Sequence, residues 1–300
     1  MQIWYVLTFS PLFICNKGNG VIKMKDIIGV QCFGMRKELE HNLRDSLQKI
    51  RDMGFDAIEP VVSVKRKSIF FKSKEWTVDT IPEFASFAEQ MRLIIPSMHV
   101  NLGLFPKQID EICEDIIKLS ECTGTKNIVF STMFSNEKSA KKWGLFLKKI
   151  SQILKPYSIK VLYHNHDDEF NKIQVNGREL YALDYFLQYA GDDVYLQLDI
   201  GWAGFTEDEV KIVEKYKHRI MEIHCKDFYQ EAKKYKKFHI PKDKFAAIGE
   251  GVIRTRQIIQ MRGKLLNYNG VIIIDQDYSQ TDIFHDFATG RQNLEAYLNE

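Results

Sequence analysis

Short runs of apolar residues alternate along most of the chain with longer segments in which apolar residues recur every three or four positions. A short continuous apolar run is typical of a strand buried in a parallel sheet, and the wider spacing is typical of a helix with one buried face. The pattern predicts eight strands, at residues 27–32, 57–61, 93–100, 127–131, 159–164, 195–199, 220–224 and 271–275.

Helical spacing fills the segments between these strands, as at residues 39–53 and 109–122. Gly54, Gly124 and Gly270 stand where a helix is expected to end before the next strand, which suits glycine because it adopts left-handed backbone angles easily. Eight alternations of strand and helix fit a closed (β/α)₈ TIM barrel better than an open doubly wound sheet. We therefore expect an α/β fold with a single domain.

The barrel is expected to occupy residues 24–300, since its first strand begins just after Met24. Residues 1–23 are predicted to be an N-terminal extension outside the fold. Their apolar run at 3–15 has no basic residue before it and is too short to cross a bilayer. An upstream extension is therefore favoured over a signal peptide.

Composition excludes several classes of protein without naming a function. Lys and Arg number 42 against 40 Asp and Glu, so the net charge of +2 gives no strong overall field for nucleic acid or an anionic membrane. The five cysteines are odd in number and form no CxxC pair, which argues against a disulfide framework and favours a cytoplasmic protein. We expect no nucleic-acid or membrane partner, and a homodimer remains open.

Metal-binding residue types stand at the ends of four successive predicted strands. They are His164, Asp199, His224 and Asp275, with Asp277 as the alternative to the last. The carboxyl ends of barrel strands meet at one face, so these side chains are expected to surround one cavity. Two imidazoles and two carboxylates suit Mn²⁺, Co²⁺, Fe²⁺ or Zn²⁺ better than Ca²⁺, so one divalent ion is predicted.

Several short motifs occur in order along the chain and together resemble the signatures of the sugar phosphate isomerase/epimerase family, whose fold is similar to that of xylose isomerase. They are IGVQCF at 28–33 with Arg36, YHNH at 163–166, LDIGW at 198–202, HCKD at 224–227, GEG at 249–251 and DQD at 275–277. The resemblance implies a metal held by the four strand-end residues. It also implies isomerisation or epimerisation of a small sugar, sugar phosphate or polyol through a metal-stabilised enediolate.

Two positions depart from the pattern of the ketose epimerases in this superfamily, which have Glu at the ends of strands five and eight. This chain has His164 and Asp275 there, so a mechanism with two glutamates does not carry over. The His-x-His formed by His164 and His166 looks more like the inosose dehydratase and keto-glycoside lyase branches. A metal-dependent lyase acting on a keto-inositol or keto-glycoside is therefore the alternative function.

Catalytic candidates lie beside the expected metal ligands. General acid or base catalysis needs a titratable group within hydrogen-bond reach of the substrate, and His166, Glu169 and Glu250 are the candidates. Lys226, two residues after His224, is expected to donate to a substrate oxygen or to stabilise negative charge beside the metal.

Four further residues are predicted to contact substrate: Glu59 and His99 at the ends of strands two and three, Asn165, and Trp202 as an apolar platform for a sugar face. Structural roles remain open for two of them, since Glu59 also suits a solvated loop and His99 also suits a buried structural histidine. The lysine-rich stretch at 233–244 suits a solvated loop, or a lid that receives an anionic substituent.

Two other classes share the expected barrel. Apurinic-site endonucleases need three metals and a basic groove for DNA, which the near-neutral charge and the ligand set do not favour. A barrel that binds sugar without turnover is disfavoured by the complete set of strand-end ligands. Substrate choice is expected to depend on the segments 63–77 and 228–248, which interrupt the alternation after strands two and seven.

Overall fold

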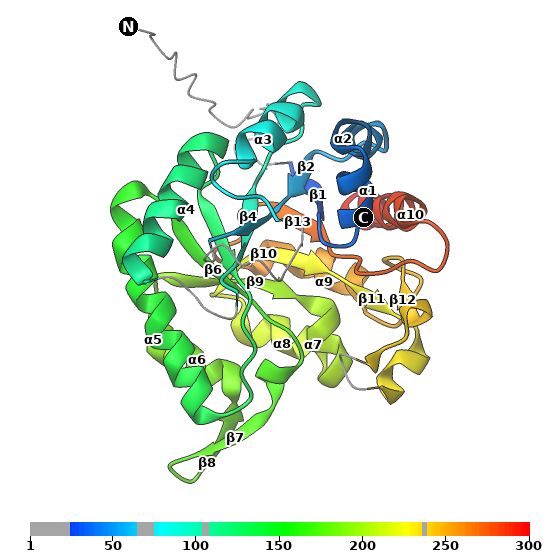
Figure 1. Cartoon of the computed structure of the whole chain (residues 1–300). Helices are drawn as coiled ribbons and strands as arrows, with labels where there is room; N and C mark the ends of the chain where they lie inside the picture. The colour runs from blue at the N-terminus through cyan, green and yellow to red at the C-terminus, as the bar shows by residue number, and fades with distance from the viewer. Residues whose placement is uncertain (1–24, 65–74, 104–107, 236–238) are drawn as a thin grey trace, which may run out of the picture.

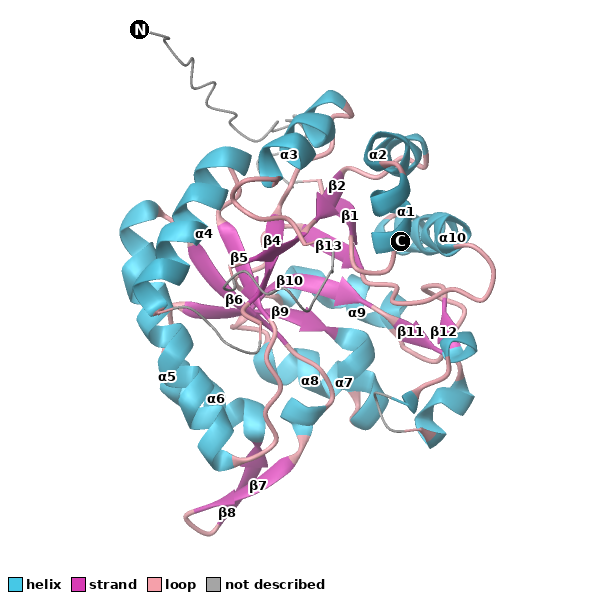
Figure 2. Cartoon of the chain, in the orientation of Figure 1, coloured by secondary structure: helices cyan, strands magenta, loops and turns pink. Residues whose placement is uncertain are grey.

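A computed structural model describes residues 25–64, 75–103, 108–235 and 239–300, so the predicted extension at 1–23 lies outside the described residues. A parallel sheet curls into a barrel, and helices lie around its outside (Figures 1 and 2). The strands neighbour one another in the order β2-β1-β13-β10-β9-β6-β5-β4-β3. Their bounds are β1 Ile27–Gln31, β2 Ala57–Glu59, β3 Val61–Ser63, β4 Ser97–Asn101, β5 Asn127–Phe130, β6 Lys160–His164, β9 Val194–Asp199, β10 Ile220–Cys225 and β13 Val271–Ile274.

The two edge strands of this sheet are halves of one strand, interrupted at Pro60. Proline has no amide hydrogen and therefore breaks a ladder of strand hydrogen bonds. The first half, β2, pairs with β1, and the second half, β3, pairs with β4. The chain thus joins both edges of the sheet within one residue, which confirms the predicted (β/α)₈ barrel.

Helices cover the outside of the barrel as predicted, with shifted ends. The predicted helix at 39–53 is two helices, because Asn42 adopts extended angles (φ −154°, ψ 96°) and its side chain accepts a hydrogen bond from the amide of Asp45. The third strand starts at Ser97, four residues later than predicted. The helices are α1 Arg36–His41, α2 Leu43–Asp52, α3 Ile81–Gln90, α4 Ile109–Thr123, α5 Glu137–Leu154, α6 Ala182–Ala190, α7 Ile200–Thr206, α8 Glu209–Tyr216, α9 Thr255–Met261 and α10 Ile283–Leu298.

Each strand sends alternate side chains outward to the helices and inward to the barrel axis, since strand side chains have a period of two. On β9, Leu196 and Leu198 belong to the apolar core beneath the helices. Gln197 and Asp199, between and after them, contact side chains of other strands inside the barrel. The same alternation places polar groups from β4 and β10 in the interior, where many TIM barrels have branched apolar side chains.

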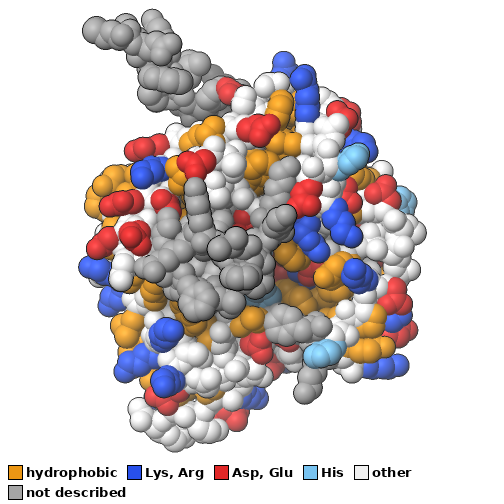
Figure 3. All heavy atoms as spheres, in the orientation of Figure 1, with side chains coloured by type: hydrophobic (Ala, Val, Ile, Leu, Met, Phe, Trp, Pro, Cys, Tyr) orange, Lys and Arg blue, Asp and Glu red, His pale blue; other side chains and the backbone are white. Residues whose placement is uncertain are grey.

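Two small antiparallel sheets extend the connections that follow β6 and β10. The first joins β7 Lys172–Val175 to β8 Arg178–Tyr181, and the second joins β11 Asp227–Phe228 to β12 Phe245–Ala246. Side chains of both charges are interspersed over the face seen in Figure 3. No helix within the described residues is long and apolar enough to cross a membrane. The cysteines of these ranges, Cys32, Cys113, Cys122 and Cys225, are all free.

Asp227 fixes the connection after β10, because its buried carboxylate accepts four backbone hydrogen bonds. Oδ1 accepts from the amides of Phe228 (2.8 Å) and Ile253 (3.0 Å), and Oδ2 accepts from those of Gly249 (3.0 Å) and Gly251 (3.1 Å). Position 251 requires glycine, since a Cβ there would lie 2.1 Å from Asp227 Oδ1. Burial nonetheless raises the pKa of this carboxyl to about 6.

Replacing Asp227 by alanine is expected to lower the free energy of unfolding by roughly 3 kcal/mol, because several buried amides lose their acceptor. Urea unfolding followed by circular dichroism measures the loss. Asp243→Ala is the matched control, since that carboxylate lies in the same connection but is exposed and pairs with Lys244, and no measurable change is expected. Equal stability of the Asp227→Ala variant and the wild type would contradict this role.

Candidate metal centre and cavity

Four polar side chains meet inside the barrel at the carboxyl ends of four neighbouring strands. His164 ends β6, Asp199 ends β9, His224 lies near the end of β10, and Asp275 directly follows β13. All four are buried, and one ligand-type atom from each lies within 4.8 Å of the others. The barrel therefore brings together the four residues that the sequence predicts as metal ligands.

The atoms in this cluster approach one another without closing a complete set of hydrogen bonds. His164 Nε2 lies 3.8 Å from Asp199 Oδ2 and 3.9 Å from Asp275 Oδ2, and His224 Nδ1 lies 3.5 Å from Asp275 Oδ2. Asp199 Oδ1 accepts from the amide of Trp202, whereas Asp199 Oδ2 has no hydrogen-bond partner within the described parts of the chain. A buried carboxylate oxygen is costly unless positive charge compensates it. The two imidazoles and two carboxylates of this cluster could together bind a divalent cation, which would supply that positive charge.

Burial and neighbouring charges shift the proton affinities of these groups in opposite directions. Burial raises the pKa of Asp199 above its ordinary value. Burial, helped by the nearby His224 and His99, lowers the pKa of His164, which leaves that ring neutral and able to donate a lone pair. Burial also opposes charge on His224, but Glu59 and Asp275 outweigh it and raise its pKa to about 10. With this pKa the His224 ring carries a proton on each nitrogen at neutral pH, and a bound cation would replace one of the two.

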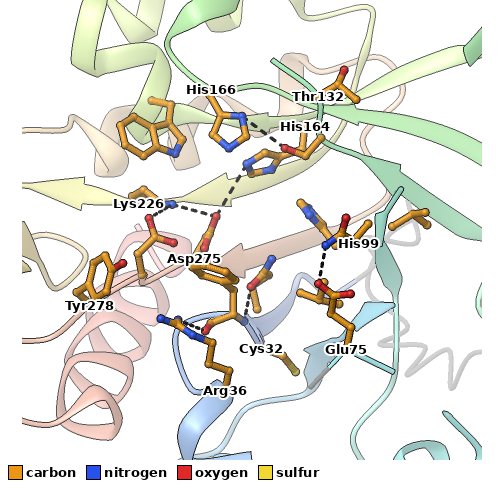
Figure 4. A pocket seen from close by; sticks show the side chains of 18 of the residues that line it. Cys32, Arg36, Glu75, His99, Thr132, His164, His166, Lys226, Asp275 and Tyr278 are labelled. Carbon is orange, nitrogen blue, oxygen red and sulfur yellow. Dashed lines mark hydrogen bonds and ion pairs between the residues drawn. The ribbon is translucent and has the colours of Figure 1, made fainter. Parts of the chain in front are cut away.

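Lys226 lies against the cluster from the cavity side, and Figure 4 shows it and His164 pointing toward Asp275. Its Nζ is 3.2 Å from Asp275 Oδ2 and 2.8 Å from Asp277 Oδ2, and it lies 5.1 Å from the ring centre of Trp202. Burial opposes its charge, yet the two carboxylates raise the pKa of Lys226 above its ordinary value. Asp275 and Asp277, which the sequence left as alternatives, both line the cavity.

Glycine at position 201 allows the first turn of α7 to lie close to the backbone of Lys226. A Cβ on Gly201 would lie 2.4 Å from the carbonyl oxygen of Lys226 and 2.6 Å from its Cβ. The LDIGW motif therefore has a packing reason for its glycine. Asp199 begins α7 by accepting the amide of Trp202, and Gly201 lets the first turn of that helix lie against β10.

A cavity of about 1040 Å³ opens above this cluster at the carboxyl end of the barrel. Predicted residues that line it are His99, His164, His166, Trp202, Lys226 and Asp275. The opposite wall includes Arg36, Glu75 and Trp76, the last two from the predicted specificity segment 63–77, whose residues 65–74 lie outside the described part of the chain. Lys242, from the lysine-rich stretch at 233–244, also lines the cavity, while residues 236–238 of that stretch are not described.

Four of the predicted catalytic and substrate-binding residues do not line this cavity. Glu59 is fully buried beneath it, with Oε1 accepting from Ser97 (2.6 Å) and Oε2 lying 3.0 Å from His224 Nε2. Asn165 is buried and exchanges two hydrogen bonds of 3.0 Å with the backbone of Asp199. Neither is placed to contact a substrate in the cavity.

The two predicted acid or base glutamates are also displaced from the cavity. Glu169 is fully buried, where it accepts hydrogen bonds from the Tyr163 hydroxyl and from the amide of His166, each 2.7 Å long. Glu250 is exposed in the turn after β12. Glu169 therefore holds the backbone of His166, and His166 itself presents its ring to the cavity, 3.4 Å from the Ser131 hydroxyl through Nδ1.

Gln197 is a central residue that the sequence reasoning missed. It is fully buried and contacts both His99 and His164 from the side opposite the metal cluster. Glutamine is a rare metal ligand and an unreactive side chain, so its type gave no signal. Its position did, because a residue two places before Asp199 on a strand faces the same side as Asp199.

Comparisons with known proteins agree with the barrel fold. A family model described as xylose isomerase-like TIM barrel matches residues 47–297. Inosose dehydratase of Histophilus somni (strain 129Pt) is 25% identical over 189 residues, which are 57% of this chain and 60% of that protein. The same enzyme of Glaesserella parasuis serovar 5 (strain SH0165) is 29% identical over 125 residues, 37% and 42% of the two chains. The matches thus span less than two thirds of these relatives.

Solved structures share the whole fold at low identity. A sugar phosphate isomerase/epimerase from Parabacteroides distasonis ATCC 8503 is similar with a TM-score of 0.73 and 18% identity, covering 91% of this chain and 97% of that one. A xylose isomerase-like TIM barrel protein from Mycobacterium smegmatis in complex with magnesium has a TM-score of 0.62 and 15% identity, covering 91% and 96%. At these identities the similarity shows the fold.

Proposed function

Because this chain belongs to the xylose isomerase-like TIM barrel family, we propose that it is a divalent-metal-dependent isomerase or epimerase acting on a small sugar, sugar phosphate or polyol. The observation that carries the proposal is the cluster of His164, Asp199, His224 and Asp275 beneath a cavity lined by His166 and Lys226. A metal centre with acid–base groups beside it can remove a proton from the carbon next to a carbonyl and return it.

The four clustered residues would hold the metal, for which Mn²⁺, Co²⁺, Fe²⁺ and Zn²⁺ fit the mixed nitrogen and oxygen donors. The magnesium complex of the Mycobacterium smegmatis protein supports metal binding by this type of barrel. A bound ion would act as a Lewis acid that polarises a substrate carbonyl and stabilises the negative charge left when the neighbouring carbon loses a proton.

The chain's own residues supply the remaining steps. His166 is the cavity-facing imidazole that takes or returns a proton, and Glu169 positions it through its backbone. Lys226, held as an ammonium by two carboxylates, donates to the substrate oxygen that becomes negative. Trp202 offers an apolar face, and His99 lines the wall where a hydroxyl would bind. Glu59, Asn165 and Glu250 receive no step in this proposal.

A lyase is the second candidate function, favoured by one specific finding. Both relatives reported above are inosose dehydratases, and this chain has a histidine, not a glutamate, at the end of β6. Both reactions begin with loss of a proton beside a carbonyl. In an isomerase or epimerase a proton then returns to the substrate. In a lyase a neighbouring hydroxyl departs instead, and Lys226 or His166 would protonate it as it leaves.

Incubation with a panel of ketoses and with inosose in D₂O, followed by NMR, tests the function and separates the two candidates. An isomerase or epimerase is expected to exchange one carbon-bound hydrogen for deuterium and to yield a product of the same composition. A lyase is expected to yield a product that has lost water. Absence of both deuterium exchange and loss of water, with every metal-loaded sample and every substrate, would contradict both.

Replacing His166 by glutamine is expected to lower kcat by roughly 10²- to 10⁴-fold, the range typical for loss of an acid–base group. Metal affinity should be unchanged, because His166 is outside the cluster of four. Steady-state kinetics and equilibrium dialysis measure the two quantities. His285→Gln, at an exposed position of α10, is the control and should turn over like the wild type. Full activity of the His166→Gln variant would remove this residue from the proton transfer.

A further inference from the structure

Gln197 saturates its hydrogen-bonding capacity inside the barrel. Its Nε2 donates to Glu59 Oε1 (2.7 Å) and to Glu222 Oε2 (2.9 Å). Its Oε1 lies 2.8 Å from His99 Nε2 and 3.2 Å from His164 Nδ1. A side-chain amide has two donors and one oxygen with two lone pairs, so these four contacts use all of them.

The surroundings determine which way the amide points. Glu59 and Glu222 are both buried. Glu59 Oε1 also accepts a hydrogen bond from the Ser97 hydroxyl at 2.6 Å. Glu222 Oε1 accepts from the side-chain amides of Asn127 at 2.7 Å and Asn269 at 3.1 Å. The Glu59 oxygen that faces Gln197 is Oε1, the same atom that accepts from Ser97, so it acts as an acceptor toward Gln197. The reverse orientation would place the amide oxygen of Gln197 against this acceptor, so the amide nitrogen must face the carboxylates.

The amide oxygen then accepts from both imidazoles. A neutral imidazole carries one N–H, and the other nitrogen has the lone pair. His164 must carry its hydrogen on Nδ1, which leaves the lone pair on Nε2, the nitrogen near Asp199 and Asp275. His99 must carry its hydrogen on Nε2, which leaves Nδ1 as an acceptor.

We propose that Gln197 is a positioning residue that fixes the ring tautomers of His164 and His99, so that His164 always presents an unprotonated Nε2 to the metal cluster. This role of Gln197 rests on the proposed function, because His164 needs a free lone pair on Nε2 in order to bind a metal. The tautomers themselves exist without a metal and can be measured in the metal-free protein.

Long-range ¹H–¹⁵N NMR of the metal-free, ¹⁵N-histidine-labelled wild type measures both tautomers directly. The signals are assigned by their disappearance in His164→Asn and His99→Asn variants. We expect a hydrogen on Nδ1 of His164 and on Nε2 of His99 at alkaline pH. The opposite tautomer, or a mixture at His164, would overturn the inference.

Two substitutions at the same position separate the acceptor from mere packing. Gln197→Leu is similar in volume but removes the acceptor together with both donors, so His164 should become a tautomer mixture and Co²⁺ should bind about 10- to 100-fold more weakly, the range seen when a metal-binding imidazole loses its supporting partner. Gln197→Glu keeps an oxygen beside both rings and should keep both tautomers, although it places a third carboxyl beside Glu59 and Glu222. Wild-type Co²⁺ affinity in Gln197→Leu would overturn the proposal.

Asn127→Leu is the matched control. It removes one donor to Glu222 in the same buried network but contacts neither imidazole, so the tautomers and the Co²⁺ affinity should stay as in the wild type. Loss of Co²⁺ affinity in this control would instead assign the effect to network stability and overturn the specific role of Gln197. A wild type with the expected tautomers but no metal binding would defeat the proposed function and leave the tautomer assignment in place.

Discussion

Asp199→Asn is expected to weaken binding of Co²⁺ or Mn²⁺ by at least roughly 100-fold and to lower kcat/KM by roughly a thousand-fold, since a Lewis-acidic metal contributes several kcal/mol to catalysis. The substitution keeps the size of the side chain and an oxygen to accept the Trp202 amide, so α7 should still begin at Ile200. It removes the negative charge on Oδ2, the buried atom that has no hydrogen-bond partner in the described structure. Isothermal titration calorimetry and steady-state kinetics measure the two losses.

Asp208→Asn provides the matched control for this change. Asp208 precedes α8 and accepts from the amides of Val210 and Lys211, as Asp199 does for α7, but it lies outside the cluster. Metal affinity and turnover should be those of the wild type. Tight metal binding by the Asp199→Asn variant would show that the aspartate serves as a helix cap and not as a ligand.

Lys226→Met is expected to affect both stability and activity. It leaves the buried Asp275 and the half-buried Asp277 without the cation that bridges them, and breaking a buried ion pair on one side costs about 3–5 kcal/mol. It also removes the donor that would stabilise negative charge on the substrate, for which we expect kcat to fall roughly 10²- to 10³-fold. Urea unfolding and kinetics on the metal-loaded enzyme measure the two effects.

Lys244→Met serves as the control for this second change, because that ammonium pairs with Asp243 on the connection between β10 and α9. It should leave kcat as in the wild type. Metal addition gives a further readout, since a cation beside Asp275 should restore part of the stability lost by Lys226→Met. A variant as stable and as active as the wild type would contradict the role given to Lys226.

The barrel could be predicted from the sequence because its strands are nearly continuous apolar runs separated by helical spacing. The errors fall where a local interaction overrides the pattern. The periodicity of Leu39, Leu43 and Leu47 continues through Asn42, so it does not reveal that Asn42 breaks the helix and caps the next one. The division of the second strand at Pro60 could be seen only once both neighbouring strands were known.

The four clustered residues could be predicted because each ends a strand, and strand ends of a barrel meet. Residues in connections were placed less well. Glu250 looked equivalent to the strand-end residues by type, but it lies in an exposed turn, while Glu169 folds back under His166. Gln197 was missed because glutamine is an unreactive residue type. Its place two residues before Asp199 indicates that it faces the barrel interior, but no local pattern encodes its contacts with β2, β4, β6 and β10.

The proposed function depends on binding of one divalent ion by His164, Asp199, His224 and Asp275. A crystal of the Mn²⁺-loaded protein, measured at the manganese absorption edge, tests it most directly. We expect one anomalous peak per chain, lying among those four side chains, and elemental analysis giving one ion per chain. A metal-loaded crystal with no peak between them, or with its peak elsewhere, would contradict it.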